Sequence, residues 1–223
     1  RFSNNSVEVE PSGNENLKLL LTTGALCNDS TLEQKGEDKA WGIIGDPTEG
    51  ALVVAAAKAG ILKQEYNGKY PRIDEIPFDS ERKMMTTFHE GYIKDKIVSF
   101  TKGAPDIILD RCTKYYINGK IEDMTPEIKN KIAEVNSSYA KQALRVLAFS
   151  YRIYDSLPQE INSETIEKDL VFIGLMGMID PPRGEAKEAM VKCSQAGIKP
   201  VMITGDYKDT AVAIALDLGM MQD

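Results

Sequence analysis

The sequence predicts an α/β fold in two parts, and three observations support this prediction. Apolar and β-branched residues form strand-like runs between residues 72 and 178. Two of these runs are joined by Asn118–Gly119, the dipeptide most typical of a two-residue hairpin turn. After Pro181–Pro182 the pattern changes to helix, strand and helix, which is typical of α/β alternation. The two prolines stiffen the backbone there, so we expect a domain junction at this point.

The first part of the chain is expected to hold two helices around one short strand. Leucines at helical spacing predict the first helix, and residues rich in Ala, Leu and Val predict the second. Pro47 suits the first turn of a helix, Asp46 is a suitable N-cap, and Gly60 is a suitable end. The expected segments are irregular residues 1–15, a helix at 16–26, a polar loop at 28–38, a strand at 41–44 and a helix at 48–59.

The rest of the chain is expected to be mainly strands, followed by the α/β segment. Glu90–Gly91 predicts a tight turn between two of the strands. The strands at 145–154 and 170–178 are almost continuously apolar, which predicts burial on both faces. The expected elements are strands at 72–78, 84–89 and 92–101, a helix at 106–112, a hairpin of 115–117 with 120–122, a helix at 125–143, the strands at 145–154 and 170–178, a helix at 185–195, a strand at 198–204 and a helix at 209–218.

The composition argues against several classes of protein. A formal net charge of −7 over 223 residues leaves no overall basic surface for nucleic acid. Cys27, Cys112 and Cys193 lie far apart, which fits a reducing compartment and neither a disulfide framework nor a zinc site. His89 is the only histidine, which argues against histidine-based metal sites and triads, and we expect it to be exposed at a strand end. No stretch reaches the roughly 18 apolar residues of a membrane helix.

Two candidate sites place lysine beside a glycine or an aromatic ring. Lys102–Gly103 ends an apolar run; glycine allows a ligand to approach the backbone, and lysine supplies a charge for a phosphate. The alternative is an ordinary strand-to-helix corner. Phe78 precedes a polar turn that ends in Arg82–Lys83, and an exposed ring there offers a face for a purine. The alternative is a buried ring beside solvated charges. Neither GxxxxGK(S/T) nor GxGxxG occurs, so any nucleotide is bound by other chemistry.

Two further candidates carry carboxylates. Helix capping explains Asp46, whereas Glu49 in the first turn can also accept a hydrogen bond from an adenine amine. The apolar run Val201–Ile203 leads into Thr204–Gly205–Asp206, at the carboxyl edge of an expected parallel strand, where ligands bind in α/β sheets. A carboxylate at this edge can help to hold Mg²⁺. The alternative is a strand followed by a helix that Asp206 caps.

Together and in this order, these motifs resemble the P-type cation-transporting ATPases, and the resemblance covers almost the whole chain. Each motif alone is weak, but seven matches in family order are specific. The stretches Cys27–Ser30 and Gly45–Leu52 are most similar to the calcium pumps of that family. The matching motifs are ALCNDS (residues 25–30), GDPTE (45–49), Phe78 with Arg82–Lys83, KGAP (102–105), LRVLA (144–148), MIDPPR (178–183) and TGD (204–206).

The resemblance implies an architecture and a set of site residues. It implies an α+β nucleotide-binding domain over residues 1–179, with a mainly antiparallel sheet flanked by helices. Residues 180–223 would form a hinge and a partial phosphorylation domain, Rossmann-like and haloacid-dehalogenase-like. Phe78 would stack on adenine, and Glu49 would contact the adenine amine. The other implied residues are Thr48, Lys83, Met85, Lys102, Gly103 and Leu147 in the nucleotide pocket, Arg145 at the phosphates, Asp180 and Arg183 in the hinge, Thr204 at the transferred phosphoryl group and Asp206 near Mg²⁺.

The resemblance also implies an activity. The intact enzyme would be an integral membrane protein that couples ATP hydrolysis, through an aspartyl-phosphate and with Mg²⁺, to transport of a cation, which the motifs suggest is Ca²⁺. The family's DKTGT and GDGxND motifs are absent, and the chain starts at Arg1, so we expect a cytoplasmic piece that binds ATP without completing the cycle and without a complete metal site.

The expected partners are ATP and the remainder of the same polypeptide, without nucleic acid. Because the strand at 198–204 lacks its neighbour, a second copy is another possible partner. Two alternatives stay open: a non-enzymatic α/β interaction module, and a piece of a haloacid-dehalogenase-like phosphatase. Nucleotide affinity separates the first alternative from the pump.

Overall fold

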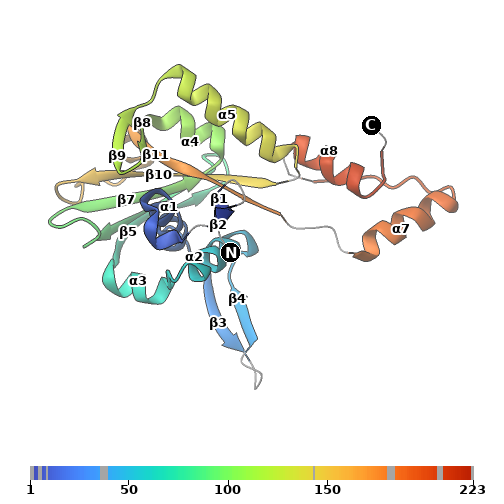
Figure 1. The fold of residues 1–223 in the computed structure, drawn as a ribbon, viewed down its shortest axis with the longest axis horizontal. Helices are drawn as coiled ribbons and strands as arrows, with labels where there is room; N and C mark the ends of the chain where they lie inside the picture. Colours follow the sequence, from blue (N-terminus) through green and yellow to red (C-terminus); the bar gives the residue numbers. More distant parts are fainter. Residues whose placement is uncertain are drawn as a thin grey trace. The chain divides into compact units, whose positions relative to one another are not determined.

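The structure is a computed structural model that describes residues 3–4, 7–8, 10–35, 40–142, 144–179, 184–204 and 208–221. The chain forms two compact units, one of Arg1–Pro126 with Leu147–Leu175 and one of Glu127–Val146 with Met176–Asp223. It passes between them at the start of helix α5 (Pro126–Ala140) and within strands β10 (Arg145–Tyr154) and β11 (Leu170–Met178) (Figure 1).

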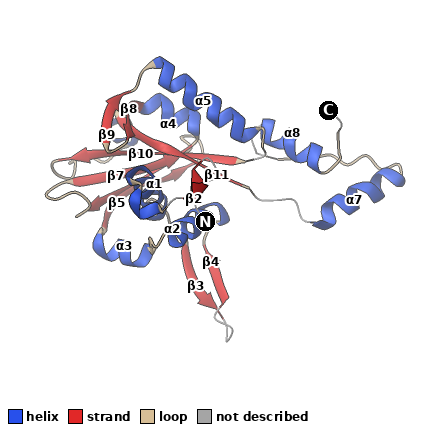
Figure 2. Ribbon diagram, in the orientation of Figure 1, coloured by secondary structure: helices blue, strands red, loops and turns tan. Residues whose placement is uncertain are grey.

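A seven-stranded sheet is the main sheet of the chain (Figure 2). Its strand order is β5-β6-β7-β10-β11-β8-β9. Neighbouring strands are antiparallel in β5–β6, β6–β7, β7–β10 and β8–β9, and parallel in β11–β8. The chain is therefore an α/β protein with a mostly antiparallel sheet, as the sequence predicts. The strands not yet given are β5 (Arg72–Asp79), β6 (Met84–Glu90), β7 (Ile97–Gly103), β8 (Cys112–Ile117) and β9 (Lys120–Asp123).

Two small sheets accompany the large one in the first unit. Strand β3 (Thr31–Lys35) pairs with β4 (Ala40–Ile44), and β1 (Ser3–Asn4) pairs with β2 (Val7–Glu8), both antiparallel. The segments expected to be irregular at residues 1–15 and 28–38 therefore contain short strands. Propensity alone could not show β3, because its polar sequence becomes a strand only through the hydrogen bonds of its partner.

Helix caps explain where the helices of the first unit begin. Asn14 accepts a hydrogen bond from the N–H of Leu17, and Asp46 accepts from the N–H groups of Thr48 and Glu49, as an N-cap does. The predicted start and end of the second helix are confirmed, since Gly60 follows it with φ +77°. The helices are η1 (Pro11–Gly13), α1 (Glu15–Leu26), α2 (Pro47–Lys58), α3 (Lys63–Lys69), α4 (Pro105–Arg111) and α6 (Ser163–Ile166).

The core of the first unit lies around the middle strands of the sheet. Helices α1 and α2 pack on each other, and α1 lies against β7. Phe88, Phe100 and Phe149, on β6, β7 and β10, are each fully buried. Residues 148–151 and 170–173 are also buried, so the predicted two-sided burial holds for these parts of β10 and β11 and fades toward their outer ends.

The second unit contains α5, α7 (Gly184–Gln195) and α8 (Lys208–Asp217). Residues 198–204, all of them described, form no strand, so that prediction is wrong. A strand needs a neighbour for its N–H and C=O groups, and no described segment pairs with this one. Val201 and Ile203 are consequently 76% and 94% exposed. None of the helices in the described residues has the length and apolar character needed to cross a membrane.

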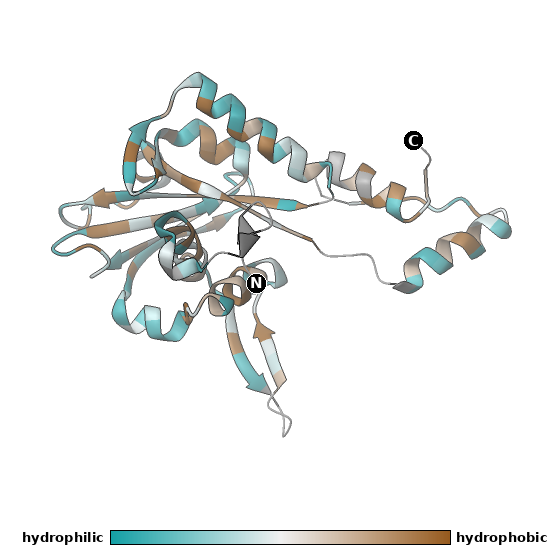
Figure 3. Ribbon diagram, viewed as in Figure 1, coloured by the Kyte–Doolittle hydropathy of each residue, from teal (hydrophilic) through white to brown (hydrophobic). Residues whose placement is uncertain are grey.

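Two further corrections concern the first unit. Strand β7 begins at Ile97 instead of Tyr92, since residues 91–95 form bends and a turn in which Asp95 has φ 58°. The Tyr92 ring packs edge-on against Phe100, with 5.2 Å between ring centroids. The connection between β6 and β7 is therefore longer than the predicted tight turn. Helices α3 and α6 are absent from the sequence predictions. Figure 3 shows why for α3, whose residues are hydrophilic throughout and give no apolar periodicity.

His89 is fully buried, so the predicted exposed position is wrong. Its Nδ1 lies 3.0 Å from the carbonyl oxygen of Tyr70, and its Nε2 lies 2.9 Å from the hydroxyl of Thr87. A carbonyl only accepts, so Nδ1 donates and Nε2 accepts from the hydroxyl, which leaves the ring neutral. Burial lowers the pKa of His89 to about 4.

We expect His89 to make the protein less stable in mild acid. In the unfolded chain the imidazole has its ordinary pKa of 6.5, whereas in the folded chain its pKa is about 4. The unfolded state therefore binds more protons between these two pH values, so the free energy of unfolding falls as pH drops from 6.5 to 4. The loss is on the order of 3 kcal/mol. An NMR titration of the single imidazole measures the pKa directly, and urea unfolding gives the stability. A measured pKa near 6.5 would contradict the buried position.

Candidate functional site

The register of the sheet gathers most of the predicted nucleotide-binding residues at one end of the first unit. Strand β7 lies between β6 and β10. Its Lys102 pairs with Met85 of β6, and its Gly103 pairs with Ala148 of β10. This end is where β5 and β7 finish and where β6 and the buried part of β10 start. The predicted residues found there are Phe78 in β5, Lys83 and Met85 at the start of β6, Lys102 and Gly103 in β7, and Leu147 in β10.

The turn between β5 and β6 presents Phe78 and Lys83 to solvent. Phe78 is 61% exposed, which confirms the predicted exposed ring and excludes a buried one. One carboxylate oxygen of Asp79 accepts from the N–H groups of Glu81 (3.1 Å) and Arg82 (2.8 Å), so the turn has a fixed backbone. Lys83 has φ 54°, and its ammonium contacts no acceptor in the described part of the chain.

Glu49 and Lys102 form an ion pair beside this end of the sheet. The side chains are 16% and 7% exposed. The second carboxylate oxygen of Glu49 accepts from the N–H groups of Asp29 (2.9 Å) and Ser30 (3.1 Å). This oxygen also lies 3.4 Å from the hydroxyl of Ser30, which has a shorter contact of 3.0 Å with the carbonyl oxygen of Asp46. The oxygen that faces Lys102 has only that one donor among the described residues, so it can accept a second hydrogen bond from a ligand.

The loop 27–30 is held from both sides around Glu49. The amide of Asn28 donates to the carbonyl oxygens of Gly24 (3.0 Å) and Glu49 (2.9 Å). From the other side, the ammonium of Lys63 donates to the carbonyl oxygens of Asn28 and Ser30, and burial lowers the pKa of Lys63 to about 8. Sequence reasoning missed Lys63, because its helix gives no periodic signal. The loop's role is to deliver two backbone N–H groups to Glu49.

Gly103 is required by a close approach of two backbones. A Cβ at this position would lie 2.5 Å from the carbonyl oxygen of Lys83 and 2.9 Å from Cγ of Met84. That same Lys83 oxygen accepts from the N–H of Ala104 at 3.1 Å. The glycine therefore joins the end of β7 to the turn that carries Phe78, which is a structural need independent of any ligand.

The remaining predicted residues have more varied positions. Met85 is 1% exposed, so its side chain belongs to the core, while Leu147 and Thr48 are half-buried. Arg145 and Thr204 are exposed residues of the second unit. Asp180, Arg183 and Asp206 lie outside the described residues. Within the described residues, no group of three or more histidine, cysteine or acidic side chains is placed to hold a metal ion.

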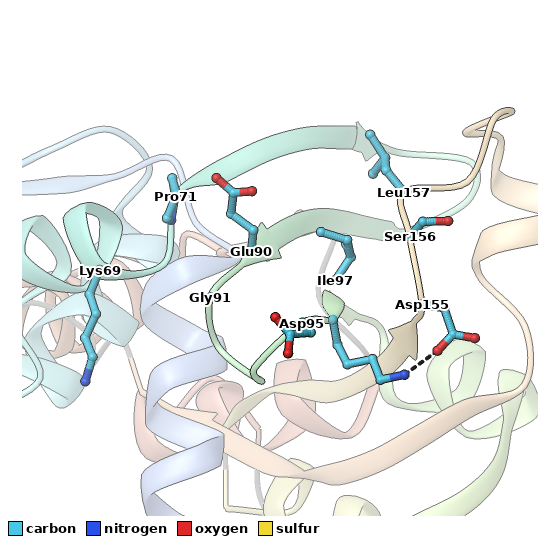
Figure 4. Close-up of a pocket in the computed structure, with 10 residues that line it drawn as sticks. Lys69, Pro71, Glu90, Gly91, Asp95, Ile97, Asp155, Ser156 and Leu157 are labelled. Atoms are coloured by element: carbon cyan, nitrogen blue, oxygen red, sulfur yellow. Dashed lines mark hydrogen bonds and ion pairs between the residues drawn. The ribbon is translucent and has the colours of Figure 1, made fainter.

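A separate hollow of about 580 Å³ opens at the opposite end of the same strands (Figure 4). Its charged rim is partly neutralised, because Lys96 pairs with Asp155. None of the predicted site residues lines it, so it carries no part of the candidate site. The lining residues are Lys69, Pro71, Glu90, Gly91, Asp95, Lys96, Ile97, Asp155, Ser156 and Leu157.

Comparison with known proteins gives a consistent result. Residues 16–185 match the family model described as P-type ATPase, cytoplasmic domain N. Over 94% of this chain, the sequence is 45% identical to the calcium-transporting ATPase 1 of Bacillus cereus. Over 99% of this chain, it is 42% identical to the calcium-transporting ATPase of Bacillus subtilis. It is 43% identical to a cation-transporting ATPase of Synechocystis over 92% of its length. The chain spans only 22–24% of the length of these relatives.

We expect Gly103→Ala to lower the free energy of unfolding by about 2 kcal/mol, because the new methyl group meets a backbone oxygen that cannot move aside. Gly68→Ala is the matched control: nothing lies within 4 Å of its Cβ, and alanine favours the helix by up to about 1 kcal/mol. Urea unfolding at one pH measures both. Equal stability of the two variants would show that the close approach at Gly103 is wrong.

Proposed function

The chain belongs to the P-type ATPases, whose cytoplasmic domain N it matches, and we propose that it binds ATP as the nucleotide-binding part of a cation pump. The observation that carries the proposal is the exposed Phe78 ring, at the same end of the sheet as Lys83, whose ammonium has no partner among the described residues. A ring that is 61% exposed leaves most of its surface without a packing partner, and a purine can provide a flat apolar partner for it.

The proposed binding mode assigns a role to each residue of this end. Adenine stacks on Phe78, which contributes roughly 1–3 kcal/mol by comparison with other base–aromatic contacts. The free acceptor position of Glu49 takes one proton of the adenine amine. Lys83 offsets the charge of the phosphates, and Lys102 orients the carboxylate of Glu49 through their ion pair. Thr48, Gly103 and Leu147 shape the surrounding wall, and Met85 supports it from the core.

The proposal extends to the intact pump. Relatives named as calcium-transporting ATPases support Ca²⁺ as the transported ion, with ATP hydrolysis through an aspartyl-phosphate in the presence of Mg²⁺. In that pump, residues 1–179 would be the nucleotide-binding domain, and residues 180–223 a hinge and part of the phosphorylation domain on the cytoplasmic side. The residues proposed for transfer are Arg145 at the phosphates, Asp180 and Arg183 in the hinge, Thr204 at the phosphoryl group and Asp206 near Mg²⁺.

We expect Phe78→Ala to weaken ATP binding about tenfold, because the stacking surface is lost while a ring that is 61% exposed contributes little to the core. Trp41→Ala is the matched control, since Trp41 is also an exposed aromatic residue of the first unit, at 68%. Calorimetric titration with ATP and with adenosine measures both variants. Lys83→Ala should weaken ATP but not adenosine.

Three outcomes of this titration are decisive. Selective loss in Phe78→Ala supports the site. Equal affinity of Phe78→Ala, Trp41→Ala and the unaltered chain removes Phe78 from it. An unaltered chain that binds no ATP at substrate-like concentrations favours the non-enzymatic interaction module instead.

We further propose that isolated chains associate through residues 198–204. Val201 and Ile203 of this segment are exposed and belong to no strand of the described residues, and a second copy offers the same apolar side chains. Ile203→Lys should reduce self-association in sedimentation equilibrium, because a charge in the pairing segment opposes burial. Leu62→Lys, an exposed apolar residue of the first unit, should leave it unchanged. A monomeric unaltered chain at all concentrations would overturn this proposal.

A further inference from the structure

Glu167 is the one fully buried acidic side chain among the described residues of the chain. It follows helix α6 and precedes β11, far in sequence from the candidate site. Removing a carboxylate from water is costly unless a cation and hydrogen bonds replace the lost hydration. A buried carboxylate in this position therefore requires an explanation. Its partners account for one oxygen, Oε1, while Oε2 is buried without a hydrogen-bond partner among the described residues.

Arg82 supplies the charge that pairs with Glu167. Its Nη1 lies 2.5 Å from Oε1 of Glu167, and the hydroxyl of Thr86 donates to the same oxygen at 2.9 Å. Nη1 of Arg111, the last residue of α4, donates to the main-chain oxygen of Glu167 at 3.0 Å. The Thr86 proton is committed to the carboxylate, so the Thr101 hydroxyl, 2.9 Å away, donates to Thr86 in turn. The pair is thus tied to β6, β7 and α4.

The other contacts of Arg82 hold both ends of the turn above it. Nη2 donates to the carbonyl oxygen of Pro77 at 2.6 Å, directly before Phe78. Nη1 donates to the carbonyl oxygen of Met84 at 3.2 Å, directly after Lys83. One planar guanidinium therefore fixes the two strand ends that bracket Phe78 and Lys83, which a single ammonium cannot do with the same geometry.

We propose that the Arg82–Glu167 ion pair is a positioning device for nucleotide binding, which holds the turn so that Phe78 and Lys83 face the ligand before it arrives. This inference rests on the proposed binding of ATP at Phe78. Neither Arg82 nor Glu167 touches the nucleotide in this arrangement. Their contribution is to remove the cost of ordering the turn on binding, since a preorganised ring loses less freedom than a mobile one.

The chemistry of the pair suggests two conservative variants. Arg82→Lys keeps the positive charge beneath the turn but loses the fork that reaches both carbonyl oxygens. Glu167→Gln keeps the shape and a hydrogen-bond acceptor but leaves the guanidinium without its countercharge. Asp155→Asn is the matched control, because it breaks the Lys96–Asp155 pair at the opposite end of the same strands.

The experiment measures ATP and adenosine affinity of the full chain by calorimetry, in the unaltered and the Phe78→Ala background. We expect Arg82→Lys and Glu167→Gln to weaken both ligands about fivefold, with folded spectra, and Asp155→Asn to have no effect. In the Phe78→Ala background the same two changes should weaken adenosine little further, because they act through the ring. A purely structural role would give the same fold-change in both backgrounds.

Because a loss of stability could also lower affinity, a second measurement follows the mobility of the Phe78 ring directly. Aromatic NMR signals of Phe78 in Glu167→Gln should broaden or shift toward values of a mobile ring, while those of Phe100 in the core stay unchanged. Unaltered affinity and an unaltered Phe78 signal in both variants would overturn the positioning role while leaving the ATP proposal intact. If instead Phe78→Ala binds as tightly as the unaltered chain, the ATP site itself is wrong, and the positioning role is overturned with it.

Discussion

The candidate site depends on the buried contact between the carboxylate of Glu49 and the ammonium of Lys102. It connects the first turn of α2 to the end of β7, and through Glu49 it also fixes the loop 27–30. Each charge would be costly to bury alone, so replacing either residue by a neutral one would leave the other charge uncompensated and would destabilise the fold. Because both partners are held by other elements, the contact leaves one acceptor position open in a fixed direction, which is what recognition of an amine requires.

A second buried ion pair, Arg82 with Glu167, complements the first. One pair lies behind the acceptor side of the candidate site, and the other beneath the turn with the stacking ring. Between them, Gly103 brings β7 against the carbonyl oxygen of Lys83. The site is therefore built on side chains that face inward, and Phe78 and Lys83 extend from this frame into solvent.

The sequence predicted the helices and strands with strong signals, including the Asp46 cap and the Asn118–Gly119 turn, whose residues have φ 50° and 79°. It missed α3 and β3, whose polar residues become ordered through tertiary contacts. Local motifs identified Phe78, Glu49 and Lys102 separately, because each has a distinctive neighbourhood in the chain. They could not show that Glu49 and Lys102 bind each other, or that Glu167 pairs with Arg82, since these contacts join residues 53 and 85 positions apart.

The backbone of Lys83 gives a last argument that this end of the sheet serves more than stability. A lysine with φ 54° adopts a left-handed conformation that costs on the order of 1 kcal/mol and that glycine would adopt freely. The strain persists because Asp79 and the Arg82 guanidinium fix the residues on either side. Glycine would relieve it but would remove the ammonium, which has no partner among the described residues. The ammonium therefore extends from a fixed turn without an acceptor in the described fold, and a phosphate of the proposed nucleotide would supply one.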